Sequence, residues 1–246
     1  MPNAIETAVQ YNEAFYEEAW RRMRLFPPES LPWWPVIRAL ADAAPDRLEV
    51  GPGLFPRLPL AGTHVVELSA VALQTLETHG AIAHHGPLQE QGLAEASIDL
   101  VGIFEVLEHV PDDVDLVREL ARITRPGGHL MLSVPLGMKY YNAYDRFMGH
   151  VRRYEPNELR TKIESAGYVL ERFEVRASSP REPVASLMVW LMIHAPNFSV
   201  WMLRDVMLPM AKYMRINWQD ASQWERGTRN ATDCSAIFRR AAPSPA

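Results

Sequence analysis

The stretch Arg47-Leu48-Glu49-Val50-Gly51-Pro52-Gly53 decides the fold of this chain. Residues 47–50 are strand-like, and two glycines follow the strand almost at once. Glycines placed directly after a buried strand let the backbone approach a ligand that side chains would otherwise exclude. The stretch therefore predicts the first core strand of an α/β fold, with a ligand site at its carboxyl end.

Strand and helix patterns alternate along the chain after this turn. Alternation of this kind implies a parallel sheet with helices on both faces, which is a doubly wound α/β fold. A capping helix is expected before the first strand, and two apolar helices are expected before the last one. The expected strands are 47–50, 65–68, 81–84, 98–104, 129–134, 168–175 and 235–239, and the expected helices are 4–25, 36–43, 70–78, 113–123, 156–166, 184–193 and 200–214.

Size and composition favour a single domain that acts on small molecules. The chain has 246 residues, 48% of them hydrophobic, a formal net charge of −5 and no Lys/Arg-rich run, so a general nucleic-acid-binding surface is not expected. Cys234 is the single cysteine, and no secretory signal is found, so we expect a cytoplasmic protein. The longest apolar stretch, 183–196, is too short to span a bilayer, although peripheral membrane contact stays open, as does a monomer or a homodimer.

The residues after the glycine turn discriminate between two kinds of cofactor. A dinucleotide fingerprint would continue to a third glycine at a helix start, but Pro56 stands there and Pro59 follows, which disfavours a crossover helix. A pyrophosphate would then lose its best anion site. S-adenosylmethionine has no phosphate, and its sulfonium and ammonium groups make Glu49 an electrostatically sensible neighbour.

Glu67 ends the second expected strand, where a carboxylate can accept both hydroxyls of a ribose. Nicotinamide and S-adenosylmethionine sites both use this device. The alternative is an exposed acid beside the helix N-cap Ser69.

An ordered set of motifs now resembles class I S-adenosylmethionine-dependent methyltransferases, and most closely the type 11 and ubiquinone-biosynthesis-like groups. The set comprises Glu-x-Gly-x-Gly at 49–53, the acid at 67, Glu-Val-Leu-Glu-His-Val at 105–110 and Arg-Pro-Gly-Gly at 125–128, within a resemblance that covers about residues 46–175. It implies a Rossmann-like, mostly parallel seven-stranded sheet with N-terminal helices and a helical C-terminal insertion. Within one domain, 1–246, we expect an N-terminal helical cap (1–45), a cofactor-binding core (46–175) and a helical cover with the last strand (176–240).

The resemblance also implies the cofactor, S-adenosylmethionine, and the residues that hold it. The missing third glycine and crossover helix depart from the family, and Gly86-Pro87 replaces a common Gly-Asp, so the usual acidic contact to the adenine amino group is absent. The implied cofactor-binding residues are Glu49, Gly51, Pro52, Gly53, Glu67, Leu68, Gly86, Pro87, Leu88, Phe104 and Glu105.

Two histidines are candidates for a catalytic base. Methyl transfer from a sulfonium is an in-line displacement, so the protein mainly orients the reactants and, for some acceptors, removes a proton. His109 follows the fourth strand at the carboxyl edge of the sheet, and His150 lies on a loop that would cover the substrate. The alternatives are a backbone-bonded histidine at a helix start and a capping loop held by salt bridges, respectively.

The same segment raises the question of a metal. If Glu105, Glu108 and His109 share one helical turn, they lie on one face, and with His150 they could ligate a divalent ion, as in some relatives. Many relatives have this string without a metal, so we expect none. Glu105 then contacts the cofactor edge, and Glu108 makes a structural hydrogen bond.

The resulting hypothesis is a methyltransferase for a small molecule or a biosynthetic intermediate. The alternatives are a nicotinamide-dependent oxidoreductase and a catalytically silent cofactor-binding scaffold. Whether oxygen, nitrogen or carbon is methylated stays open, and residues 184–214 favour a helical cover or dimer face before a hydrophobic acceptor site.

Overall fold

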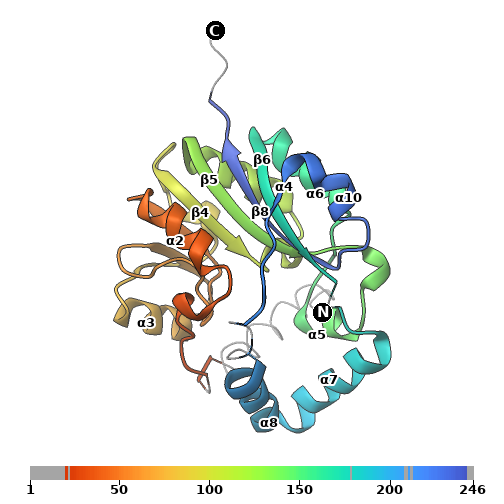
Figure 1. Cartoon of the computed structure of the whole chain (residues 1–246). Coiled ribbons are helices and arrows are strands. Elements are labelled where there is room, and N and C mark those ends of the chain that lie inside the picture. Colours follow the sequence, from red (N-terminus) through yellow and green to blue (C-terminus); the bar gives the residue numbers. More distant parts are fainter. Residues whose placement is uncertain (1–19, 22, 178, 208–209, 211–212, 243–246) are drawn as a thin grey trace, which may run out of the picture.

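The computed structural model describes residues 20–21, 23–177, 179–207, 210 and 213–242. These residues form an eight-stranded sheet with the order β3-β2-β1-β4-β5-β8-β6-β7 (Figure 1). The strands are β1 (Arg47–Val50), β2 (His64–Glu67), β3 (Ile82–His85), β4 (Ile98–Phe104), β5 (Thr124–Pro135), β6 (Tyr168–Arg176), β7 (Gln219–Asp220) and β8 (Asp233–Arg240).

The strands β3, β2, β1, β4 and β5 are parallel to one another, whereas β8 is antiparallel to both β5 and β6. The prediction of a doubly wound, mostly parallel sheet is therefore confirmed. The sheet has one strand more than the predicted seven, because the two-residue β7 pairs with Arg172 and Phe173 at the far edge. A strand of two residues is too short to produce a readable alternation in the sequence.

The helices also follow the predicted order. Ser69 caps α3 by accepting a hydrogen bond from the Ala72 N–H at 3.2 Å, and Pro156 occupies the first turn of α6, where its missing N–H has no consequence. The helices are α2 (Trp34–Asp42), α3 (Ala70–Thr78), α4 (Asp113–Ile123), α5 (Ala143–Met148), α6 (Pro156–Ser165), α7 (Glu182–His194), α8 (Pro196–Trp201) and α10 (Trp224–Gly227), with short turns η1 (Pro28–Ser30), η2 (Leu88–Glu90), η3 (Leu107–His109), η4 (Met138–Tyr140) and η6 (Ala221–Gln223).

Three segments bear on the predicted helices. The connection between Gly53 and His64 contains no helix, which confirms the expected loss of the first crossover helix. The predicted helix 200–214 is wrong as a single element, because α8 ends at Trp201 and a π-turn, η5 (Met202–Met207), follows it. The predicted helix 4–25 lies mostly outside the described residues.

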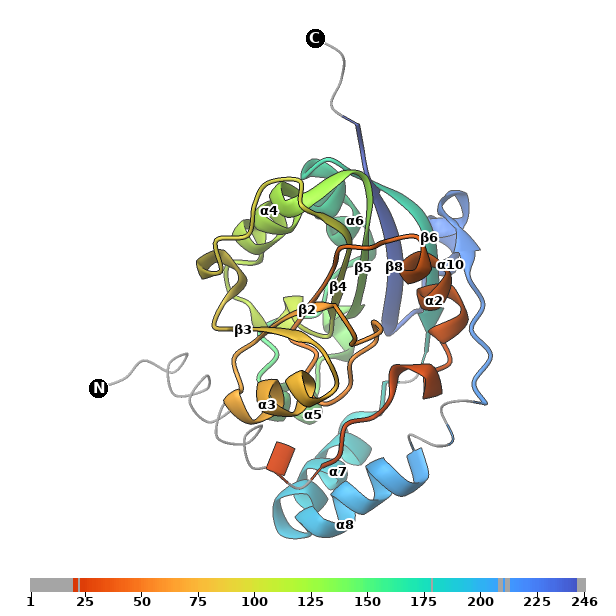
Figure 2. The ribbon, with the colours of Figure 1, turned by 90° about the vertical axis from the view of Figure 1, so that its left-hand side faces the viewer.

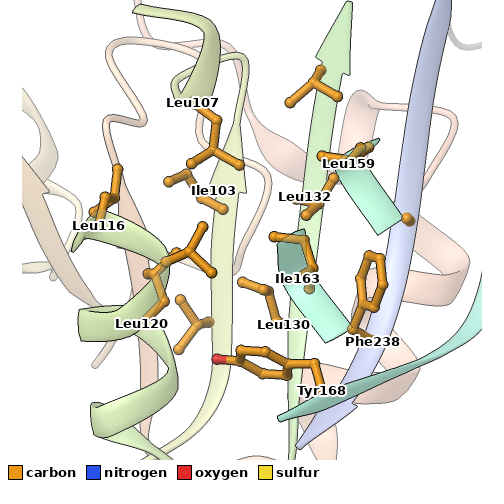
Figure 3. Close-up of a cluster of buried hydrophobic side chains, with 14 of the residues drawn as sticks. Ile103, Leu107, Leu116, Leu120, Leu130, Leu132, Leu159, Ile163, Tyr168 and Phe238 are labelled. Atoms are coloured by element: carbon orange, nitrogen blue, oxygen red, sulfur yellow. The ribbon is translucent and has the colours of Figure 1, made fainter. Parts of the chain in front are cut away.

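Helices cover both faces of the sheet. On one face, Leu116 and Leu120 of α4 and Ile163 of α6 pack on side chains from β4, β5, β6 and β8 (Figure 3). On the other face, Ile37 of α2 packs with Met131 and Ile237, and Figure 2 shows α2 on the side of the sheet away from α4 and α6. Burial of these large side chains, each stabilising the fold by about 1.5–3 kcal/mol, holds the strands rigidly and so fixes the positions of their carboxyl ends.

The carboxyl ends of β1, β2, β4 and β5 lie at one edge of the sheet, on the side of α5, α7 and α8 (Figure 1). Ligands of open α/β folds bind at this edge. The segments that follow these strands carry the glycine turn, Glu67, both candidate histidines and α5.

Candidate functional site

The glycine turn after β1 has the backbone that only glycine adopts easily. Gly51 and Gly53 have φ angles of 62° and 52°, and the Gly51 N–H donates to the Val66 carbonyl at 2.8 Å. A Cβ added to Gly51 would lie 2.7 Å from Val106, and one added to Gly53 would lie 2.3 Å from the Trp20 ring. Both positions are therefore closed to other residues, and the Trp20 indole covers the second half of the turn.

Glu67 holds its carboxylate against this turn. It accepts hydrogen bonds from the N–H groups of Gly53 at 2.9 Å, Leu68 at 2.8 Å and Ser69 at 3.0 Å. A carboxylate has about four lone-pair directions, so these bonds fix its orientation and leave capacity for a ribose hydroxyl. The predicted contact of Glu67 with a ribose stays a prediction.

Glu49 is turned toward the proline-containing loop. Its side chain is buried and accepts hydrogen bonds from the N–H groups of Arg57 at 2.8 Å and Leu58 at 2.8 Å. Burial raises the pKa of Glu49 to about 7, although these hydrogen bonds and the Arg57 charge oppose the rise. The structure thus gives Glu49 a demonstrable part in holding residues 57–58, and its contact with a cofactor ammonium stays a prediction.

Arg57 is a site residue to which the sequence analysis gave no role. Its guanidinium lies over the Trp33 ring at 4.9 Å and over the Phe104 ring at 4.5 Å. Its Nη2 is 3.9 Å from the Glu105 carboxylate. Burial lowers the pKa of Arg57, and the Glu105 charge opposes this change. The sequence feature that could have indicated Arg57 is its place directly after Pro56, in a loop that Pro56 and Pro59 bound.

Glu105 begins the segment after β4 in an unusual conformation. Its φ of 56° is left-handed, which costs a non-glycine residue about 1–3 kcal/mol, and the Ser133 hydroxyl donates to its carboxylate at 2.5 Å. The hypothesis that Glu105, Glu108 and His109 share one helical turn is wrong, because η3 starts only at Leu107. The left-handed residue turns the chain sharply at the end of the strand.

The remaining predicted cofactor residues follow β2 and β3, and their contact with a cofactor stays a prediction. Gly86 has a φ of 110°, and the Pro87 carbonyl accepts a hydrogen bond from the Gln91 side chain at 2.9 Å. Leu88 is buried in the core on the α4 side of the sheet, whereas Leu68 is 54% exposed. The Leu68 side chain is thus accessible from solvent, while the Leu88 side chain anchors the segment after β3 in the core. Pro52 is buried beside the glycine turn.

The two candidate histidines lie together, although 41 positions separate them in the sequence. Their rings meet edge to face with centroids 4.7 Å apart. His150 Nδ1 is 2.8 Å from the Asp145 carboxylate, and the Tyr141 hydroxyl donates to the His150 carbonyl at 2.7 Å. Burial, followed by the charge of His150, lowers the pKa of His109 to about 4, so His109 is neutral at pH 7.

Asp145 orients His150, and the sequence analysis did not predict this contact. It caps α5 by accepting a hydrogen bond from the Asn142 N–H at 2.9 Å, and it also accepts one from Arg153 Nε at 2.8 Å. Burial alone would raise the pKa of Asp145, but the hydrogen bonds from His150 and Arg153 lower it. The sequence feature that could have indicated this contact is the capping-box pattern of Asn142 and Asp145, which a histidine follows five residues later.

Glu108 completes this cluster. It is fully buried, and neither carboxylate oxygen has a hydrogen-bond partner of acceptable geometry among the described residues. The Nε2 atom of His150 lies 3.9 Å from the Glu108 carboxylate. Burial, followed by repulsion from Glu105, raises the pKa of Glu108 well above its usual range. Glu108 therefore lacks the structural hydrogen bond that we expected of it.

Glu108, His109 and His150 could together hold a cation. One ligand atom from each lies within 4.8 Å of the others. Two histidines and one carboxylate form a common zinc-type donor set, and the Asp145 contact is the outer partner that such a histidine usually has.

Side chains cover the glycine turn in the described conformation. Two surface hollows, of about 300 Å³ beside β6 and about 390 Å³ beside α4, are lined by none of the predicted site residues. Trp20, Phe55 and Arg57 instead fill the space around the glycine turn, with the Trp20 and Phe55 rings 5.9 Å apart. The Trp20 ring thus lies on the face from which a cofactor would approach Gly53, and the cofactor contacts of this turn stay a prediction.

Comparison with known proteins agrees with this arrangement. Residues 48–132 match a family described as "Methyltransferase domain". The chain is 36% identical over 89 residues to a Mycolicibacterium smegmatis protein named "Probable S-adenosylmethionine-dependent methyltransferase", covering 35% of each chain. It is 35% identical over 119 residues to a ubiquinone biosynthesis O-methyltransferase of Ralstonia nicotianae, covering 43% of this chain and 49% of that one.

Residues 48–132 of this chain therefore match the methyltransferase domain family, and the surrounding fold is that of solved methyltransferases. A solved S-adenosylmethionine-dependent methyltransferase from Mesorhizobium loti shares this fold, with a TM-score of 0.52 and 15% identity over 87% of this chain and 100% of that one. The family and the fold of this methyltransferase domain imply S-adenosylmethionine as the cofactor. They do not favour a nicotinamide-dependent oxidoreductase.

The chain matches only a part of each of these relatives. The matched part of the methyltransferase domain spans about a third to a half of the length of these curated relatives. The solved [4+2]-cyclase SpnF has the same fold, with a TM-score of 0.58 and 14% identity over 98% of this chain and 97% of that one. A shared fold therefore does not by itself define the reaction, which has to be argued from the site.

Proposed function

We propose that this protein transfers a methyl group from S-adenosylmethionine to a small-molecule acceptor. One observation carries the proposal: the paired histidines and Asp145 lie at the sheet edge that also carries the glycine turn and Glu67. A cofactor site and a group able to take a proton are thus on the same side of the sheet. The matches to methyltransferases support the same conclusion.

Each part of the site has a proposed role. When bound, S-adenosylmethionine supplies an electrophilic methyl group. Glu67 accepts hydrogen bonds from the ribose hydroxyls, while Gly51, Pro52 and Gly53 give the backbone close approach. Phe104, Glu105, Leu68, Gly86 and Pro87 border the remaining cofactor surface, with Leu88 packed beneath them.

His150 is the proposed base. The Asp145 carboxylate at Nδ1 leaves Nε2 to take the proton of the acceptor, and it stabilises the positive charge that the ring then acquires. His109 is neutral at pH 7, so it accepts or donates a hydrogen bond and orients the acceptor against the His150 ring. General-base catalysis of this kind contributes about 10²–10⁴-fold to a rate.

Calorimetry on the full chain tests the cofactor assignment. We expect S-adenosylhomocysteine to bind saturably, and Glu67→Gln to weaken its binding. NADH serves as the matched control, because its ribose could use the same carboxylate. Absence of S-adenosylhomocysteine binding at millimolar concentration, or NADH binding of similar strength, would contradict the proposal.

A metal-dependent version of this reaction is the second candidate, and one observation favours it. Glu108 is buried without a hydrogen-bond partner beside two histidines, a costly arrangement that a divalent cation would relieve. Titration of the chelator-treated protein with Zn²⁺ or Mn²⁺, monitored by calorimetry, tests it. Binding that Glu108→Gln abolishes would establish the site, and no binding to the wild type would leave the metal-free reaction.

The proposed setting is the cytoplasm, with the protein as a monomer or homodimer. The lone cysteine and the lack of basic runs support an intracellular small-molecule reaction in place of nucleic-acid methylation. Fractionation of cells that express the tagged chain, together with light scattering of the purified protein, tests both statements.

A further inference from the structure

The helices α7 and α8 with the π-turn η5 form an element that we call the apolar hairpin (182–207). Sixteen large hydrophobic residues are strongly exposed among the described residues, and ten of them lie between residues 184 and 214. Four belong to α7 and two to α8: Val184, Leu187, Trp190, Ile193, Phe198 and Trp201, each 45–57% exposed. Exposure concentrated in this way marks an interaction surface.

The composition of the apolar hairpin differs from that of a helix that covers a protein core. No Asp, Glu, Lys or Arg lies between Glu182 and Arg204, and Ala185 is the only buried residue of α7. Such a helix is apolar on all sides, so it has no polar face to present to water. Water is therefore an unfavourable neighbour for most of its surface.

The dimensions of the hairpin suit the surface of a bilayer. No single helix in the described part of the chain is long and apolar enough to cross a membrane. The segments Glu182–His194 and Asn197–Met207 pass that test only together, and they are bent by 112°. Trp190 and Trp201 add the aromatic side chains that are enriched at the interface between lipid and water.

The charges that flank the hairpin in the sequence favour a lipid surface. Arg181, Lys212 and Arg215 flank it, while the hairpin itself holds one Arg and two acids, Arg204, Glu182 and Asp205, in a chain whose net charge is −5. The Glu182 carboxylate is already paired with Arg146 at 2.7 Å. An anionic lipid surface would complement the three flanking cations.

The apolar hairpin is attached to the candidate site. The Ala143 N–H donates to Glu182 at 3.0 Å, and the Asn142 side chain donates to the Pro180 carbonyl at 3.1 Å. Both contacts are made by α5 and its cap, the element that also carries Asp145. Figures 1 and 2 show α5 beside α7 at the carboxyl edge of the sheet.

We propose that the apolar hairpin docks this protein on the surface of a lipid bilayer, with α7 and α8 inserted at the level of the headgroups. The carboxyl edge of the sheet then faces the membrane. Docking needs no catalytic step, so it is measurable whether or not the proposed methyl transfer is correct.

Flotation of the full chain with vesicles tests the proposal. Vesicles of phosphatidylcholine, alone and mixed with phosphatidylglycerol, are the probes, and we expect binding to both, stronger on the mixture. The double substitution Leu187→Asp with Trp190→Asp is expected to lower the partition coefficient at least about tenfold, because two large apolar side chains no longer enter the lipid.

A matched control places the same two charges elsewhere. Ile82→Asp with Val114→Asp replaces two residues that are 45% and 40% exposed on β3 and α4, and it should bind vesicles like the wild type. Circular dichroism establishes that each variant is folded. Three results would overturn the proposal. The first is an equal loss of vesicle binding in both variants, and the second is binding that occurs only on charged vesicles and is abolished by salt. The third is a protein that binds no vesicles but forms a dimer that the α7 variant dissociates.

Discussion

Replacement of Glu49 by glutamine should change how the stability of the protein depends on pH. Burial raises the pKa of Glu49 in the folded state from 4.5 to about 7. The folded protein therefore favours the neutral carboxyl, and this contribution is fully present below about pH 4.5. It is lost progressively as pH rises toward 7. The separation of the two pKa values corresponds to about 3 kcal/mol of unfolding free energy.

Glutamine is neutral at every pH, so Glu49→Gln should not show this loss. Its amide cannot accept both the Arg57 and the Leu58 N–H bonds as well as the carboxyl does, and this defect should lower stability by a pH-independent amount of about 1–3 kcal/mol. The difference in unfolding free energy between wild type and variant should consequently shift in favour of the variant, by about 3 kcal/mol, between pH 4.5 and pH 8.

Urea denaturation followed by tryptophan fluorescence, repeated across this pH range, measures the difference. Glu77→Gln, which changes an exposed carboxylate on α3, is the control and should leave the pH dependence of the wild type unaltered. Parallel pH curves for wild type and Glu49→Gln would refute the reasoning, because they would mean that Glu49 stays ionised in the fold. The hydrogen bonds from the N–H groups of residues 57 and 58 would then lower the pKa of Glu49 by more than burial raises it.

Three further results are expected. Glu67→Gln should raise the dissociation constant for S-adenosylhomocysteine by about 10–100-fold in calorimetry, since charge-assisted hydrogen bonds contribute about 1.5–3 kcal/mol, and an unchanged constant would remove the ribose role. Trp20→Ala should tighten the same binding, because the indole covers the glycine turn in the described conformation; weaker binding would make Trp20 part of the cofactor wall. With an acceptor in hand, His150→Ala should slow turnover by about 10²–10⁴-fold and His109→Ala should slow it less, whereas unchanged rates in both would leave the base unassigned.

The parts of the fold that were predictable from the sequence are those with strong local patterns. The mostly apolar strand β4 and the periodic helix α4 match their predicted ranges because neighbouring residues determine them. The loss of the crossover helix followed directly from Pro56 and Pro59. The split of the predicted helix 200–214 into α8 and a π-turn was not readable, since the whole region is apolar and has no clear period.

The sequence offered candidate site residues but not the contacts among them. Glu67 ends β2 and His109 follows β4, so their place at the carboxyl edge followed from the sheet, whereas His150 lies after α5. Only tertiary packing places Asp145 on His150 and leaves the Glu108 carboxylate without a partner. Glu49 shows the same limit, because its burial under residues 57–58 depends on a loop whose path the sequence pattern does not specify.

The position of β8 has a consequence for the order in which the chain can fold during synthesis. Residues 233–240 lie between β5 and β6, and β6 has no neighbours in the sheet other than β8 and β7. While a ribosome still holds these residues in its exit tunnel, β5 presents an open strand edge, and β6 can pair only with the two residues of β7. Unpaired edges of this kind are the parts of a nascent chain that chaperones protect from aggregation. Completion of the sheet therefore waits for β8, which joins β6 and β7 to the strands that carry the site.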